Sequence, residues 1–304
     1  MTPPDAPPGA AVTLRTLRAM AREGKPFAAL TCYDATTARW LARAGLHILL
    51  VGDTAAEMVL GFPSTIHAPL DFMVTITAAV KRGAPSAFVM ADMPFLSYTV
   101  DDAAAITNAG RFMVEGLADC VKLEATAAHA PLVEKLTRAG IPVCAHVGSR
   151  PQQAGLSGGY AAAGRTPSEA TAVVEDAVAL ERAGAVLLLV EAVPEEVTRR
   201  ILEETSVPLI GIGAGQACHG QVLVLQDLLG MTDRPPVFAP AIAQLGAALQ
   251  QAGQEWVRLV AERRVRGHRF EMRGEKPARA GQPGATSPVE QSQLQQGSSA
   301  PRPS

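Results

Sequence analysis

Aromatic residues make up only 4% of the 304 residues, and the formal net charge is just −2 with histidine neutral. Few aromatic side chains leave little material for the stacking platforms that bind single-stranded nucleic acid. A balanced charge also provides no basic surface for a phosphate backbone or for an anionic membrane. The composition therefore predicts a protein that binds neither nucleic acid nor membranes.

Cysteine is scarce as well, and the four residues never form a Cys-x-x-Cys pair; they are Cys32, Cys120, Cys144 and Cys218. This spacing favours neither a structural zinc site nor a disulfide framework. The sequence also lacks an apolar run long enough to span a membrane, and residues 1–11 do not have the basic and apolar segments of a secretory signal. We therefore expect a cytoplasmic protein.

Apolar residues, in contrast, are abundant: they account for 48% of the chain, against 18% charged residues. This balance predicts a globular protein with a sizeable core. Residues 274–304 differ, because they are rich in Gly, Pro, Ser and Gln and cannot bury enough apolar surface to offset the entropy of ordering. We predict a single catalytic domain over residues 12–273 and a disordered tail over residues 274–304.

A recurring pattern organises the predicted domain: a helical stretch ends in a basic residue and glycine, and a short apolar run follows. Glycine tolerates the left-handed conformation that ends a helix, and the basic residues complement the negative end of the helix dipole. The glycines are Gly45, Gly83, Gly140 and Gly184. Continuous apolar runs are typical of strands buried on both faces of a parallel sheet. The eight predicted strands cover residues 27–31, 48–51, 87–90, 120–123, 142–145, 186–190, 209–212 and 222–225.

Eight alternating strand and helix units in a chain of this length predict an α/β protein with a (β/α)8 TIM-barrel fold. A further helix near residues 14–22 is placed to close the N-terminal end of the barrel. An open, doubly wound sheet is the alternative architecture.

Charged and polar residues stand at the ends of the predicted strands, where (β/α)8 barrels place their active sites. Each of them could instead cap a helix or form a salt bridge in a loop. Their convergence on one mouth favours a functional site. In chain order they are Asp53, Asp92, Lys122, Glu124, His146 and Glu191.

Three carboxylates at one mouth need a cation, and Asp53, Asp92 and Glu124 offer the hard oxygen ligands that Mg²⁺ prefers. An octahedral ion with few protein ligands leaves positions for a bidentate 2-oxo acid. It would stabilise the enolate that forms when the neighbouring carbon loses a proton. Lys122 and the Thr54 hydroxyl could bind the substrate carboxylate, although Lys122 could also serve only to neutralise the acids.

Glu191 follows the apolar run 186–190, so the sequence places its carboxylate between an apolar wall and the substrate. That position suits a general base that removes a proton from carbon. Alternatively, Glu191 caps the helix that begins near Pro194. His146 could hydrogen-bond the substrate, orient a metal-bound water or have only a structural role.

A set of short motifs runs in order through residues 14–238. They are TCYD (31–34), VGDT (51–54), AVKRGAP (79–85), ADMPF (91–95), VKLE (121–124), HVG (146–148), VEAVP (190–194), GIGAG (211–215) and GQVLV (220–224). Together they resemble the ketopantoate hydroxymethyltransferase family, metal-dependent barrel enzymes of pantothenate biosynthesis. The combination is far more specific than any one of its motifs.

The resemblance implies transfer of a hydroxymethyl group from 5,10-methylenetetrahydrofolate to 3-methyl-2-oxobutanoate, giving 2-dehydropantoate. It implies that Asp53 and Asp92 bind Mg²⁺, with Glu124 completing the shell directly or through water. It places the oxo acid against Asp53, Thr54, Asp92 and Lys122, with His146 as a supporting residue at the substrate. Glu191 would accept the proton. A large homo-oligomer is also implied.

The chain departs from the family pattern at several places, which include residues 63–69, His219 and Val237, and two departing loops bear on the activity. It has GDTAAE at residues 52–57 where the family usually has GDSLGM, and Ala161 stands where the family usually has lysine. These departures leave two alternatives open. One is a Mg²⁺-dependent lyase or aldolase that acts on a related 2-oxo acid. The other is a non-catalytic paralogue that assembles with an active homologue.

Overall fold

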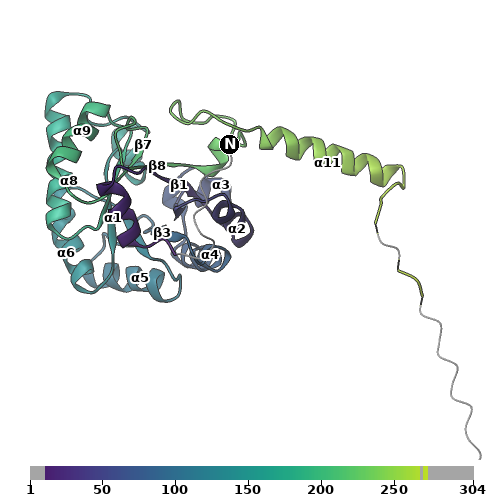
Figure 1. Cartoon of the computed structure of the whole chain (residues 1–304), viewed down its shortest axis with the longest axis horizontal. Coiled ribbons are helices and arrows are strands. Elements are labelled where there is room, and N and C mark those ends of the chain that lie inside the picture. Colours follow the sequence, from purple (N-terminus) through teal and green to yellow (C-terminus); the bar gives the residue numbers. More distant parts are fainter. Residues whose placement is uncertain (1–10, 268–269, 273–304) are drawn as a thin grey trace, which may run out of the picture. The chain divides into compact units, whose positions relative to one another are not determined.

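The computed structural model describes residues 11–267 and 270–272 (Figure 1). Its eight parallel strands pair in chain order, and the last pairs with the first, so the sheet closes into a barrel. The predicted TIM barrel is confirmed, and the open sheet is excluded. The strands are β1 (Phe27–Thr31), β2 (Ile48–Val51), β3 (Phe88–Asp92), β4 (Cys120–Glu124), β5 (Val143–Gly148), β6 (Leu187–Glu191), β7 (Leu209–Ile212) and β8 (Gly220–Leu223).

Several strands differ from their predicted bounds at the mouth of the barrel. The predictions end β3, β4 and β5 where the apolar runs end, but these strands continue to Asp92, Glu124 and Gly148. The added residues are still paired, because Asp92 lies opposite Lys122 and Glu124 lies opposite His146. β8 begins two residues earlier than predicted, at Gly220, and Leu225 belongs to a helix.

In the described residues, one α-helix precedes the strands, eight lie between them along the chain and two follow the last strand. They are α1 (Leu14–Arg22), α2 (Ala35–Arg43), α3 (Ala55–Met58), α4 (Leu70–Gly83), α5 (Asp102–Val114), α6 (Ala130–Arg138), α7 (Ala154–Ser157), α8 (Pro167–Arg182), α9 (Glu195–Glu204), α10 (Leu225–Leu228) and α11 (Leu245–Ala261). Short 3₁₀ helices are η1 (Thr65–His67), η2 (Ala127–His129) and η3 (Pro151–Gln153). Polar side chains fix several helix starts: Asp34, for example, accepts the backbone N–H groups of Thr36 and Thr37 at the start of α2.

The chain divides into two compact units, residues 1–254 and 255–304, and the barrel lies in the first. The predicted tail, residues 274–304, lies outside the described residues. Among the helices of the described residues, none has the length and apolar character needed to cross a membrane.

Side chains alternate along each strand between the barrel interior and the surrounding helices. One apolar cluster fills the barrel interior below the polar strand ends. It contains inward-facing residues, for example Phe88 and Met90 of β3 and Leu187 and Leu189 of β6. Leu17 of α1 is fully buried in this same interior cluster. The predicted closing helix is therefore confirmed, because α1 covers the end of the barrel opposite to the polar strand ends.

Three of the four predicted glycine joints have the expected backbone. Gly45, Gly140 and Gly184 have φ values of 85°, 83° and 105°, in the left-handed region that favours glycine. Gly83 also ends a helix before a strand, as predicted, but it does not have the positive φ expected there. Gly83 is the last residue of α4, and a Cβ atom there would lie 2.4 Å from the carbonyl oxygen of Ala35. Its lack of a side chain allows α4 to pack closely on α2.

We expect Gly83→Ala to lower the free energy of unfolding by about 1–3 kcal/mol, because a methyl group has no room against the backbone of α2. Gly110→Ala is the matched control, since Gly110 lies inside α5 with no neighbouring atom within 4 Å of its Cβ position. There the higher helix propensity of alanine should raise stability by about 0.5–1 kcal/mol. Urea unfolding measures both, and a change of the same sign in the two variants would contradict the packing role of Gly83.

Candidate active site

One cavity of about 610 Å³ lies at the C-terminal mouth of the barrel. Its walls include the ends of the strands and the loops that follow them. All seven residues that the sequence singles out for the site line this cavity. They are Asp53, Thr54, Asp92, Lys122, Glu124, His146 and Glu191.

Strand alternation explains why these side chains point inward. Met90 and Cys120 face the apolar interior, so Asp92, two residues after Met90, and Lys122, two residues after Cys120, face the same way. Each polar residue thus replaces an apolar one in the top layer of the barrel. The register places Asp92 beside Lys122 across β3 and β4.

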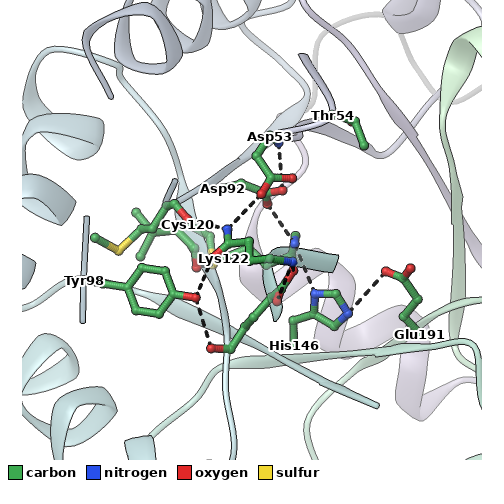
Figure 2. A network of polar contacts seen from close by, with 12 residues as sticks. Asp53, Thr54, Asp92, Tyr98, Cys120, Lys122, His146 and Glu191 are labelled. Atoms are coloured by element: carbon green, nitrogen blue, oxygen red, sulfur yellow. Dashed lines mark hydrogen bonds and ion pairs between the residues drawn. The ribbon is translucent and has the colours of Figure 1, made fainter. Parts of the chain in front are cut away.

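A buried charge cluster joins these residues (Figure 2). Lys122 Nζ lies 3.0 Å from Asp92 Oδ1, and the backbone N–H of Asp53 donates to Asp92 Oδ2 at 3.1 Å. The side chains of Asp92 and Lys122 are 5% and 8% exposed, so the ion pair is almost wholly removed from water. Lys122 therefore does neutralise acids, as one of the two interpretations of this residue states, and it also lines the cavity.

Two carboxylates at the mouth, Asp53 and Glu124, are hard to ionise. Burial and the charge of Asp92 raise the pKa of Asp53 to about 7. Burial raises the pKa of Glu124 to about 8, against the opposing effect of Lys122. For Lys122, burial lowers the pKa, but the charges of Asp92 and Asp53 outweigh it and leave the pKa raised. The Lys122 ammonium group therefore stays charged, but it does not compensate for the burial of the acids around it.

His146 connects Lys122 to Glu191. Its Nδ1 lies 3.3 Å from Lys122 Nζ, and its Nε2 lies 3.3 Å from Glu191 Oε2. An ammonium group can only donate, so Nδ1 must accept and the proton of the neutral ring must sit on Nε2. That N–H is then directed to the Glu191 carboxylate. Burial and the charge of Lys122 lower the pKa of His146, which favours this neutral form.

The contact between His146 and Glu191 is longer and less well directed than a formed hydrogen bond. Hydrogen bonds between catalytic groups are often long before substrate binds and tighten in the complex. Figure 2 shows the two side chains facing each other at the edge of the cluster.

Glu191 is the last residue of β6, and its side chain is 19% exposed where it borders the cavity. The helix-capping alternative for Glu191 is wrong. α9 begins at Glu195 with Pro194 at the N-cap position, and the acidic residues of its first turn are Glu195 and Glu196.

Thr54 follows the second strand and lies at the start of α3. Its hydroxyl lies 2.5 Å from the hydroxyl of Tyr33, which is buried at the end of the first strand. Burial raises the pKa of Tyr33, so the phenol keeps its proton. A protonated phenol can donate to Thr54, which leaves the Thr54 O–H free to donate into the cavity.

Sequence reasoning misses Gln152, Tyr98 and the role of Tyr33. Gln152 lies on η3, and its amide donates to Asp53 Oδ2 at 2.8 Å across 99 positions of sequence. Tyr98 donates to the Gln152 side-chain oxygen at 2.8 Å. No local pattern identifies such residues, because their contacts arise only when separate loops meet at the mouth. Tyr33 lies inside the TCYD motif, so its position beside the site is the one signal that the sequence offers.

The side chains at the mouth fit a hard divalent cation. Asp92 Oδ1 is buried and, apart from its ion pair with Lys122, accepts no well-directed hydrogen bond from the described residues. Within residues 11–267 and 270–272, no three His, Cys, Asp or Glu side chains already converge on one metal position. Mg²⁺ is commonly held by one or two carboxylates and keeps several waters or substrate oxygens, so the free lone pairs of Asp92 Oδ1 are of the kind that it binds. Asp53 and Asp92 would be direct ligands, and Glu124 would act through water.

A family model described as ketopantoate hydroxymethyltransferase matches residues 11–265. A 3-methyl-2-oxobutanoate hydroxymethyltransferase from Halorhodospira halophila is 46% identical over 252 residues, covering 83% of this chain and 91% of the relative. An enzyme of the same name from Hyperthermus butylicus is 44% identical over 245 residues, covering 81% of this chain and 85% of the relative.

Solved structures with little sequence identity share the fold. A phosphonopyruvate hydrolase in complex with oxalate and Mg²⁺ is 14% identical, with a TM-score of 0.57, covering 82% of this chain and 87% of that chain. A 2,3-dimethylmalate lyase is 18% identical, with a TM-score of 0.53, covering 86% of this chain and 90% of that one. At these identities the likeness concerns the barrel alone.

We expect His146 to make the metal-free protein less stable in acid. The folded protein holds this ring neutral, whereas the unfolded chain protonates it below about pH 6.5, so the unfolded state binds more protons there. The free energy of unfolding therefore decreases as the pH falls through the pKa that the imidazole has in the unfolded chain. Urea unfolding between pH 7 and pH 5 should show a shallower loss for His146→Gln than for wild type.

The control is His67→Gln, which makes the same change at an exposed histidine. It should keep the wild-type dependence on pH. An acid dependence of His146→Gln equal to that of wild type would contradict the assignment of a neutral, buried imidazole.

Proposed function

The chain belongs to the ketopantoate hydroxymethyltransferase family, and we propose that it transfers a hydroxymethyl group from 5,10-methylenetetrahydrofolate to 3-methyl-2-oxobutanoate. One water is consumed, and the products are 2-dehydropantoate and tetrahydrofolate. The observation that carries the proposal is the single cavity lined by a candidate base, Glu191, and by the charge cluster around Lys122. The 2-oxo acid would be held by the cluster with its C3 carbon toward Glu191.

Glu191 accepts the proton from C3 of the oxo acid. The electron pair of the broken C–H bond moves toward the keto oxygen at C2, giving an enolate. His146 supports this step, because its Nε2–H faces Glu191 Oε2 and can orient the carboxylate once the contact tightens in the substrate complex. The enolate carbon then forms the new C–C bond with the one-carbon unit of the folate. Both C–N bonds of the methylene bridge break, water supplies the hydroxyl group of the product, and the proton from C3 and the second proton of water end on the two folate nitrogens.

We place the substrate carboxylate against two donors other than the Glu191–His146 pair, namely Lys122 and Thr54. Lys122 supplies a positive charge that no pH change in the physiological range removes, since its pKa is raised. Thr54 supplies a hydroxyl that Tyr33 holds in place. A charge and an oriented donor together fix both the position and the direction of a small anion.

We propose Mg²⁺ as the cofactor, held by Asp53 and Asp92 and by Glu124 through water. When bound, the ion supplies a Lewis acid that draws negative charge from the keto oxygen. The carboxylate oxygens of this cluster and the shortage of compensating charge around them support the assignment.

The cavity has room for a second reactant beside the small oxo acid, because ligand sites of roughly 300–1,000 Å³ accept drug-sized molecules and this one measures about 610 Å³. Glu57, Tyr160 and Ala161 form part of its wall. We place the folate on that wall.

We also propose a large homo-oligomer in the cytoplasm. Exposed apolar side chains gather in the segment that includes α3 and η1, and this composition is common at subunit interfaces. They are Val59, Leu60, Phe62 and Ile66. Sedimentation velocity should give a mass several times that of one chain, and a monomer at micromolar concentration would contradict this proposal.

Proton exchange at C3 tests the enzymatic proposal directly. In D₂O with Mg²⁺ and without folate, the wild-type enzyme should remove the C3 proton signal of 3-methyl-2-oxobutanoate in the NMR spectrum. We expect Glu191→Gln to slow this exchange by at least about 100-fold, because the amide cannot accept the proton. Binding of Mg²⁺ and of the oxo acid should be retained. Added methylenetetrahydrofolate should give 2-dehydropantoate with wild type only.

Glu196→Gln is the control, since it makes the same chemical change at an exposed residue in the first turn of α9. It should exchange at the wild-type rate. Equal exchange by Glu191→Gln and wild type would remove Glu191 as the base. Exchange by wild type without product would leave the enolate step and require a different electrophile. A wild-type protein that binds both ligands without exchange would support the non-catalytic paralogue.

A further inference from the structure

Gln152 is a buried residue on η3, and it contacts both acids that flank the charge cluster. Its side-chain Nε2 donates to Asp53 Oδ2 at 2.8 Å, while its backbone N–H lies 3.1 Å from each of the two Glu124 carboxylate oxygens. One residue therefore spans two side chains that come from the ends of different strands. Neither contact belongs to the regular pairing of the barrel.

The orientation of the Gln152 amide is fixed from both ends. Nε2 also donates to the carbonyl oxygen of Met93 at 3.0 Å, and Oε1 accepts from the Tyr98 hydroxyl at 2.8 Å. A flipped amide would turn its oxygen toward two acceptors and its N–H groups toward a donor. Each polar atom of the side chain is thus matched by a partner of the required kind.

Tyr98 is well placed to hold that amide. Its ring is buried, and burial raises the pKa of its hydroxyl, so the hydroxyl keeps the proton that it donates. The Glu124 carbonyl oxygen is a second acceptor at 3.2 Å, which keeps Tyr98 next to the same strand end.

A turn at Gly148 and Ser149 directs the chain from the end of β5 to Gln152. Gly148 closes β5 with a φ of 91°, and a Cβ atom there would lie 2.5 Å from the Glu191 carbonyl oxygen. The next residue, Ser149, donates its N–H to that carbonyl oxygen at 2.9 Å. The loop that carries Gln152 is therefore anchored to the end of β6 before it crosses to Asp53 and Glu124.

We propose that Gln152, with its amide held by Tyr98, is a positioning residue that fixes the carboxylates of Asp53 and Glu124 for a divalent cation. The inference rests on the proposed function, because it takes these two acids as part of the cation site. Gln152 occupies Oδ2 of Asp53, so Oδ1 remains for the cation. The two-oxygen contact with the backbone N–H centres the Glu124 carboxylate and restricts its rotation.

A purely structural role is the competing explanation. Gln152 joins loops from four parts of the barrel mouth, so its loss could lower stability without any effect on the cation. The two explanations differ in what a binding measurement shows. A positioning role changes the affinity for the cation, whereas a structural role changes only the unfolding temperature.

The test is the dissociation constant for Mn²⁺, which shares the preference of Mg²⁺ for octahedral oxygen ligands and is counted in its free form by EPR. Gln152→Met keeps the length of the side chain and removes its donors. We expect Mn²⁺ to bind at least about tenfold more weakly, as is usual when a partner of a metal ligand is lost. Tyr98→Phe leaves both Nε2 contacts in place, so a smaller loss of roughly three- to tenfold is expected.

Two further variants frame the result. Asp53→Asn removes a proposed ligand and should abolish binding, which identifies the site that the EPR signal reports. Thr198→Val is the matched structural control, because Thr198 is fully buried and donates to the Ala214 carbonyl oxygen at 2.7 Å outside the cavity lining. It should lower the unfolding temperature and leave the Mn²⁺ affinity unchanged.

Wild-type affinity in Gln152→Met, with binding abolished in Asp53→Asn, would overturn the positioning role and leave the cation site intact. If Gln152→Met does not fold, wild-type affinity in Tyr98→Phe overturns the role in the same way. Mn²⁺ binding that Asp53→Asn does not affect would show instead that the proposed cation site is wrong, and this inference would fall with it.

Discussion

The ion pair between Lys122 and Asp92 allows the mouth of this barrel to be charged and buried at once. Two ions that leave water lose several kcal/mol of solvation each, and only close contact and further partners offset that loss. Lys122 meets this condition by contacting Asp92 and His146 together. Burial is the main cause that raises the pKa values of Asp53 and Glu124 to about 7 and about 8, and the single ammonium group of Lys122 does not offset it. The remaining imbalance is the physical reason to expect a divalent cation.

The same ammonium group also acts on the base, although it does not touch it. Because Lys122 can only donate, it requires His146 Nδ1 to accept, and the ring then presents Nε2–H to Glu191. One imidazole therefore links Lys122, proposed to bind the substrate, to Glu191, the proposed base. An exchange of Lys122 for a neutral residue would free the histidine to take the other tautomer. Substrate binding and the orientation of the base thus depend on a single charge.

Much of this arrangement can be read from the sequence because a barrel strand is short and regular. A buried strand appears as an apolar run, and a polar residue at its end has no place except the mouth. Asp92, Glu124 and Glu191 were found in this way, and all three line the cavity. The same reasoning ends the strands too early, because it treats the first charged residue as a boundary although that residue is still paired.

The rest depends on contacts between loops that no local pattern encodes. Gln152 and Asp53 meet across 99 positions, and the close approach of α4 to α2 at Gly83 looks in the sequence like an ordinary helix end. A periodic signal reports which face of an element is buried, but not which distant residue it will contact. Residues that serve as partners of other side chains are therefore found only in three dimensions.

Two of the residues that depart from the family pattern, Glu57 and Ala161, lie at the wall of the cavity. The contacts that bind Lys122, Asp92, His146 and Glu191 into one network include neither of them. Burial and the charge of Asp227 raise the pKa of Glu57, so this wall is a second acidic environment with its own neighbours. Changes there alter what the outer cavity accepts, while the groups that would remove the proton keep their geometry. The departures at Glu57 and Ala161 thus leave the network of the proposed base intact.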